Sequence, residues 1–322
     1  MSVHELKRAL VLEWPAESIS ALPKALEQLK HWAQITPLHT ALRHKRHGQW
    51  YAWRWIDALR DVERLADGLR QHGFTEDSRL ILSGAFEPNL LLLALAAQTI
   101  GGQTLTLADN LEPVTLHKLL WRIRPTHAYV QGRQQVQHWL ATAGSSAAPQ
   151  LLITEQAAAA SDVLGFAQLL GPVDPAQRLT RWWQPTGETA LWSEEGTQWQ
   201  GGLSVVLEQW LNSGQSLAFP ESQGSARRDR SEVAPTGLLL SPARLQHVAD
   251  DIERRLAPVG TWRRRLCDWA IAHPQSGLRR LIKNRVRKLL GFQRLQYIWQ
   301  APSTRQGPAT PEWLAEFKRD IA

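Results

Sequence analysis

The sequence comprises 322 residues, of which 43% are hydrophobic and 21% charged, and its formal net charge is +7. This composition is ordinary for a soluble globular protein with one large or two modest domains. The longest apolar runs are shorter than the roughly 18 residues of a membrane span, Glu5 and Glu13 interrupt any signal-peptide pattern, and a single cysteine, Cys267, excludes an intramolecular disulfide. We therefore expect a cytoplasmic protein.

The first part of the chain predicts helices and a hairpin. One or two helices are expected before residue 35, and Ser18 or Ser20 is placed to cap the second. Alternation in ALRHK, a His47-Gly48 turn and the run QWYAWRW predict a β-hairpin. Apolar residues at helical spacing from Asp57 to Gln71 predict an amphipathic helix that ends near Gly73.

Three strands then alternate with two helices. The expected order is the strand SRLILSG, a helix from Pro88 to Gly101-Gly102, the strand QTLTLA, a helix from Leu116 to Ile123, and the strand THAYVQG. Because strands joined by crossover helices pair in parallel, this pattern predicts a doubly wound, mostly parallel α/β sheet.

A second α/β unit is expected in the other half. Its elements are a helix from Gly202 to Ser213, a strand from Ser216 to Phe219, a turn-rich Arg/Asp segment, a strand from Gly237 to Leu240, and a helix that Pro242 opens. The strand LLIT precedes this unit; a basic helix at 277–291, the strand RLQYIW and a last helix follow it. The expected organisation is N-terminal helices at 1–35, a first α/β subdomain at 36–170, a junction at 171–190, and a second α/β subdomain at 191–322.

Several segments follow the pattern of one enzyme family, in the family's order. TPLHTALRHKRHGQWYAWRW is followed by a helix carrying LADGL and later by QTLTLADNL; then come LNSGQSLAFPES, RDRSEVAPTGLLLSPARLQHVADDIERRL, GTWRRRLCDWAI and RLQYIWQAP. Together these segments resemble the AMP-forming acyl-CoA synthetases, and those of the second half resemble the long-chain fatty acid branch. The resemblance covers about 36–140 and 188–320. It implies the family's large N-terminal α/β domain, with ATP, Mg²⁺ and CoA as cofactors.

The phosphate loop of that family is altered here. In the family, a Ser/Thr/Gly run ends in Pro-Lys-Gly, so that backbone N–H groups and a lysine approach the phosphates. This sequence has no lysine between Lys118 and Lys283. The nearest match is WSEEGTQWQGG, in which the candidate nucleotide-binding residues are Gly196, Thr197, Gln200 and Gly201. Gln200 replaces the lysine, and Glu194 and Glu195 are expected to repel a triphosphate.

The other family sites are incomplete. Gln300, Ala301 and Pro302 stand in the place of the family's Gly-Ala-Pro adenine loop. The sequence ends at Ala322, where the Tyr-Gly-x-Thr-Glu motif would begin, so the Mg²⁺-binding glutamate and the mobile C-terminal domain are expected to be missing. Since adenylation needs this electrostatic machinery, we assign no catalytic residue and no metal site. We expect a pseudoenzyme of fatty acid metabolism whose partner is an acyl group or another lipid-metabolism protein; the alternative is an active fatty acid–CoA ligase completed by another polypeptide.

A basic segment offers a further alternative. Between Arg263 and Arg294, ten Lys or Arg residues accompany one acid, Asp268. The expected basic helix there places apolar residues on one stripe, and this pattern is typical of a helix packed on a core with a solvated face. A peripheral membrane-binding module would use the same basic residues on an anionic membrane surface: Arg279, Arg280, Lys283, Arg287 and Lys288. Nucleic acid is not favoured, because the sequence carries no recognisable nucleic-acid-binding motif.

Overall fold

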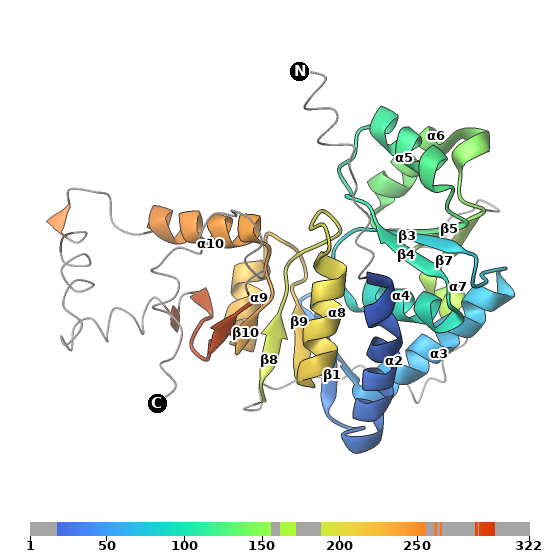
Figure 1. Ribbon diagram of the computed structural model, residues 1–322. Helices are drawn as coiled ribbons and strands as arrows, with labels where there is room; N and C mark the ends of the chain where they lie inside the picture. Colours follow the sequence, from blue (N-terminus) through green and yellow to red (C-terminus); the bar gives the residue numbers. More distant parts are fainter. Residues whose placement is uncertain are drawn as a thin grey trace.

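The computed structural model describes residues 18–155, 162–171, 188–255, 261–262, 265, 287–288 and 290–299. These residues form two sheets of mostly parallel strands with helices packed around them (Figure 1). This architecture confirms the predicted α/β fold class. Within the described part of the chain, no helix has the length and apolar character needed to cross a membrane.

The first sheet has five parallel strands, which confirms the predicted doubly wound sheet. Their spatial order is β4 (Gln103–Thr106), β3 (Arg79–Ser83), β5 (His127–Val130), β6 (Leu151–Thr154) and β7 (Val163–Gly165). The chain passes from β3 to β4 on one side and continues to β5 on the other. The carboxyl ends of β3 and β5 therefore mark the topological switch point of this sheet.

Helices cover both faces of the first sheet (Figure 1). On one face lie α5 (Pro113–Ile123) and α6 (Arg133–Ala147); on the other lie α3 (Trp55–Gln71), α4 (Pro88–Ile100) and α7 (Phe166–Leu170). The sequence pattern did not predict α6, β7 or α7. The α6 sequence is rich in Ala, Ser and Gly and has little periodicity, and the other two elements are very short; buried Trp139 and Phe166 anchor α6 and α7.

The second sheet contains the predicted hairpin. Its order is β11 (Tyr297–Ile298), β10 (Gly237–Leu238), β8 (Ala190–Trp192), β9 (Ser216–Phe219), β1 (Thr40–Arg46) and β2 (Gln49–Arg54). Only β1 and β2 are antiparallel in this sheet. The hairpin was grouped with the first sheet by its position in the sequence, and its pairing with β9 corrects that grouping. The domain boundaries themselves stay a prediction, because 172–187 of the junction lie outside the described residues.

The second α/β unit differs from expectation in one segment. α8 (Gly202–Ser213), β9 and α10 (Pro242–Arg255) follow the predicted order, and β10 is shorter than predicted. The segment expected to be turn-rich contains a helix, α9 (Ala226–Val233). That expectation was wrong because Asp229 and Arg230, which look like surface residues in the sequence, are buried in the fold.

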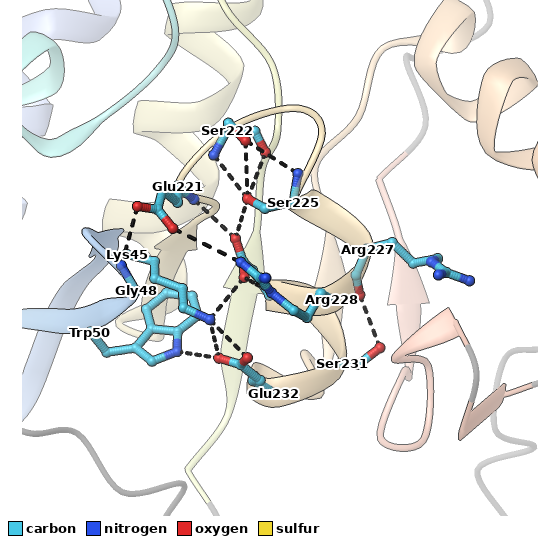
Figure 2. A network of polar contacts seen from close by, with 11 residues as sticks. Lys45, Gly48, Trp50, Glu221, Ser222, Ser225, Arg227, Arg228, Ser231 and Glu232 are labelled. Carbon is cyan, nitrogen blue, oxygen red and sulfur yellow. Dashed lines mark hydrogen bonds and ion pairs between the residues drawn. The ribbon is translucent and has the colours of Figure 1, made fainter.

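Polar contacts attach α9 to the hairpin (Figure 2). Lys45 Nζ of β1 lies 2.9 Å from Asp229 Oδ1 and 2.6 Å from Glu232 Oε2. Trp50 Nε1 of β2 donates a hydrogen bond to the same Glu232 oxygen. In the segment before α9, Ser225 Oγ and the Glu221 amide donate to Asp229 Oδ2. A buried carboxylate therefore connects two elements that are 184 residues apart in the sequence.

The main core lies between the two sheets and contains buried Trp55 and Trp210, and partly buried Trp32 packs against it. Trp32 comes from α2 (Ser18–Ile35), Trp55 from α3 and Trp210 from α8. The rings of Trp55 and Trp210 are stacked with centroids 5.3 Å apart, and Trp32 lies 5.9 Å from Trp55. Trp210 also donates to the Ala41 carbonyl at the start of β1. The tryptophans thus hold three helices and the second sheet together.

Candidate functional site

The predicted phosphate loop connects β8 to α8 at residues 193–201. Gly201 has a φ of 73°, in the left-handed region that glycine tolerates, and it precedes the first residue of α8. The next residue, Gly202, lies so close to the Trp199 ring that a Cβ would stand 2.4 Å from it. The loop therefore has the strand–turn–helix placement of a phosphate-binding loop, which is the context expected for such a motif.

Glu194 points into the protein. Its side chain is 7% exposed, and Oε2 accepts hydrogen bonds from Trp192 Nε1 and Arg230 Nη1, each at 3.0 Å. Arg230 also donates to the Leu290 carbonyl at 2.9 Å. The charge of this cation is thus balanced by Glu194 inside the fold.

Glu195 is also buried, with 3% exposure. Its Oε1 accepts a hydrogen bond from the Ser241 amide at 2.7 Å. Burial raises the pKa of Glu195, while the bonds from Ser241 act in the opposite direction. These positions correct our expectation for Glu194 and Glu195: both carboxylates are bound within the protein instead of facing a ligand at the surface.

Gly196 and Thr197 dock on the first sheet at its switch point. The Thr197 amide donates to the Gly84 carbonyl at 2.8 Å, and the Gly84 amide donates to Thr197 Oγ1 at 3.0 Å. Gly196 forms a β-bridge with Ala85, and a Cβ there would stand 2.7 Å from the Gly84 carbonyl oxygen. The backbone of this half of the loop therefore connects the two sheets.

The four predicted phosphate-loop residues do not form one surface. Gly196 and Thr197 are buried, whereas Gln200 and Gly201 are exposed at the end of the loop that leads into α8. A triphosphate needs several backbone N–H groups and a cation on one accessible face. In the described part of this loop the Thr197 amide is already bonded, and Arg230 is paired with Glu194. The buried half of the loop, Gly196 and Thr197, therefore does not face a phosphate of ATP at the surface.

The predicted adenine loop, Gln300 to Pro302, lies outside the described residues. The residue before it, Trp299, contacts Trp199 with ring centroids 5.5 Å apart and an interplanar angle of 60°. The structure therefore brings the end of β11 next to the predicted phosphate loop. The sequence did not predict this pair. The Trp-rich composition was a signal, but only the fold reveals which tryptophans meet.

The basic candidates differ in what the structure describes. Arg279, Arg280 and Lys283 lie outside the described residues, and Lys288 is exposed. Arg287 is buried and donates to the Phe292 and Leu295 carbonyls, each at 3.0 Å. Its guanidinium is used inside the fold, which corrects its assignment as a residue facing a membrane surface. Among the described residues, no group of three or more His, Cys, Asp or Glu side chains is arranged to hold a metal ion.

Among the comparisons with known proteins, only the comparison with solved structures finds matches. No family model matches this sequence, and no curated protein matches it. Solved structures do match. The A-PCP didomain of carboxylic acid reductase from Segniliparus rugosus, in complex with AMP, has a TM-score of 0.65 at 13% identity over 98% of this chain and 56% of that chain. Acetoacetyl-CoA synthetase from Streptomyces lividans has a TM-score of 0.58 at 13% identity, and the match covers 91% of this chain and 49% of that chain. Coronafacic acid ligase from Pectobacterium brasiliense has a TM-score of 0.55 at 10% identity, and the match covers 73% of this chain and 53% of that chain.

The chain therefore has the fold of the large N-terminal domain of adenylate-forming enzymes. It spans about half the length of the three structures named above. At such low identity the likeness establishes the architecture, and the activity has to be argued from the residues of this chain.

Proposed function

We propose that this chain is an acyl-CoA synthetase-like protein that does not adenylate fatty acids by itself. The observation that carries the proposal is the state of the β8–α8 loop. Its two carboxylates are bound inside the protein, Thr197 is hydrogen-bonded to Gly84, and Gln200 replaces the lysine. In a ligase of this kind, ATP would supply the adenylyl group and the pyrophosphate leaving group, and Mg²⁺ would neutralise charge on that leaving group. A loop closed in this way offers little stabilisation to that leaving group.

Binding of an acyl group would place weaker demands on the loop. Binding an acyl chain depends on apolar surface and needs no phosphate cradle. We therefore propose a role in fatty acid metabolism in which the protein binds an acyl ligand or a lipid-metabolism partner without turning over ATP. The resemblance of the second half to the long-chain branch supports this choice of ligand.

Pyrophosphate release tests the proposal. The purified chain is mixed with ATP, Mg²⁺, CoA and a panel of medium- and long-chain fatty acids, with an active acyl-CoA synthetase as the positive control. We expect release at the background level for every acid. Turnover by the chain alone would overturn the proposal. Turnover that appears only when a second polypeptide is added would instead support a ligase made of two chains.

A further inference from the structure

A cluster of polar side chains around buried His44 joins the two sheets. His44 and Arg46 come from the end of β1 in the second sheet, Glu87 precedes α4, and Glu155 follows β6. His44 Nε2 lies 3.7 Å from Glu87 Oε1. Arg46 Nη2 lies 3.8 Å from Glu87 Oε2 and 3.8 Å from Glu155 Oε1. The cluster thus connects the second sheet to the carboxyl edge of the first.

The hydrogen bonding of His44 makes its ring neutral. Arg46 Nε donates to His44 Nδ1 at 3.0 Å, so Nδ1 carries a lone pair and the ring proton is on Nε2. His44 is 2% exposed. Burial, together with the neighbouring Arg46 charge, lowers the pKa of His44 to about 3. His44 is therefore no counter-ion for Glu87 in this arrangement.

The remaining charges favour a proton on Glu87. One guanidinium, that of Arg46, faces the two carboxylates of Glu87 and Glu155. The Glu87 side chain is 18% exposed and that of Glu155 is 38% exposed, so Glu87 is the less hydrated of the two. The hydroxyl of buried Tyr129 belongs to the same surroundings and adds no charge. Burial and the charge of Glu155 raise the pKa of Glu87 to about 7.

We propose that His44 and Glu87 exchange a single proton as the two sheets dock, so that Glu87 holds it in the docked state and His44 holds it when the sheets separate. The docked pair is then two neutral groups, and the separated pair is a solvated carboxylate and imidazolium. The same segment of chain carries the loop contacts, since Phe86 donates to the Glu195 carbonyl at 2.8 Å and Gly84 binds Thr197. The proton exchange therefore accompanies the docking of the β8–α8 loop.

This exchange has a consequence for pH. When solvated, the two groups titrate near their ordinary values of 4.5 for Glu and 6.5 for His. Between these values the docked and separated states hold the same number of protons, so docking is independent of pH there. Removing Glu87 leaves the His44 effect alone, and docking then weakens as pH falls below 6.5. Removing His44 leaves the Glu87 effect alone, and docking then weakens as pH rises from 4.5 towards 7.

Hydrogen exchange measures docking at the residues concerned. The Phe86 and Thr197 amides donate hydrogen bonds between the first sheet and the β8–α8 loop. Their exchange rates are corrected for the intrinsic effect of pH on amide exchange. We expect similar protection in the wild type from pH 5 to pH 6.5. In Glu87→Gln, protection at these amides should rise roughly fifteenfold over this range; in His44→Asn, which keeps an acceptor for Arg46, it should fall by a similar factor.

The chain offers a matched control for the glutamate. Glu112 precedes Pro113 at the start of α5 as Glu87 precedes Pro88 at the start of α4, but Glu112 is exposed. Glu112→Gln should behave as the wild type does. Slopes of the same sign in Glu87→Gln and His44→Asn, or no slope in either, would overturn the proposal.

A measurement on the wild type makes the test independent of whether the variants fold. The imidazole ¹⁵N shifts of His44 are assigned in a wild-type sample labelled with ¹³C and ¹⁵N. These shifts report the tautomer and the charge of the ring. We expect the neutral Nε2–H form throughout pH 5 to 7. An imidazolium at pH 5.5 would contradict the proposed location of the proton.

Discussion

Asp229 is the residue whose removal should most weaken the attachment of α9 to the hairpin. Its side chain is fully buried and accepts hydrogen bonds from Lys45 Nζ at 2.9 Å, from Ser225 Oγ at 2.5 Å and from the Glu221 amide at 3.1 Å. Lys45 is 5% exposed and also pairs with Glu232, which is 41% exposed. Replacing Asp229 with Ala removes the only buried counter-charge of Lys45 among these described contacts.

The size of the effect follows from this arrangement. Removing one partner of a buried ion pair typically costs about 3–5 kcal/mol, because the other charge stays buried without compensation. Glu232 still neutralises part of the Lys45 charge, so we expect Asp229→Ala to lower the free energy of unfolding by about 3 kcal/mol. The double variant with Lys45→Met should lose less than the sum of the two single variants, because neither charge then remains unpaired.

Urea unfolding followed by far-UV circular dichroism measures these changes. Asp67→Ala is a suitable control, since Asp67 is 69% exposed and pairs with Arg70 on the surface. It should stay within about 0.5 kcal/mol of the wild type. A loss for Asp229→Ala no larger than that of the control, or strict additivity with Lys45→Met, would refute the reasoning.

Acid should remove the stabilisation that the Asp229 carboxylate contributes to the folded protein. Burial alone would raise the pKa of Asp229, but the hydrogen bonds from Ser225, Lys45 and the Glu221 amide outweigh it and lower the pKa. The stabilisation is therefore present above the ordinary value of 3.8 and is lost as pH falls through the lowered value in the folded protein. The difference between the wild type and Asp229→Asn should accordingly shrink in acid.

Two further predictions concern single positions. Gly196→Ala should lower the free energy of unfolding by about 2 kcal/mol, because its Cβ would meet the Gly84 carbonyl. Gly201 has open space around it but a φ of 73°, so Gly201→Ala should lower the free energy of unfolding by about 1 kcal/mol. Equal losses of stability for the two variants in thermal unfolding would contradict the docking of the loop. Burial raises the pKa of Asp61 to about 6, so the folded state loses stability as pH rises from 3.8 towards 6. Asp61→Asn retains the hydrogen bond from Trp53. It should therefore raise the free energy of unfolding by about 1–2 kcal/mol at pH 7.5 and change it little at pH 4, as measured by urea unfolding at both pH values.

The sequence predicted the candidate loop but not its use. The segment WSEEGTQWQGG between an expected strand and an expected helix located the loop at 193–201, and the absence of lysine there was visible directly. That Glu194 and Glu195 point inward was not visible, because their partners, Arg230 and Ser241, lie more than 30 residues away in the sequence. A carboxylate beside a glycine-rich loop looks solvent-exposed until the tertiary structure supplies its donor.

The sequence by itself determined the local elements and the class of fold. Helical spacing in α3, the turn at His47-Gly48 and the alternation of strands with helices in the first sheet depend on neighbouring residues, so they can be read in order. Only the tertiary structure decided that the hairpin pairs with β9, that α9 is a helix around a buried aspartate, and that a histidine and a glutamate meet between the sheets. These features depend on contacts between distant segments, and their strength comes from burial, which a sequence does not display.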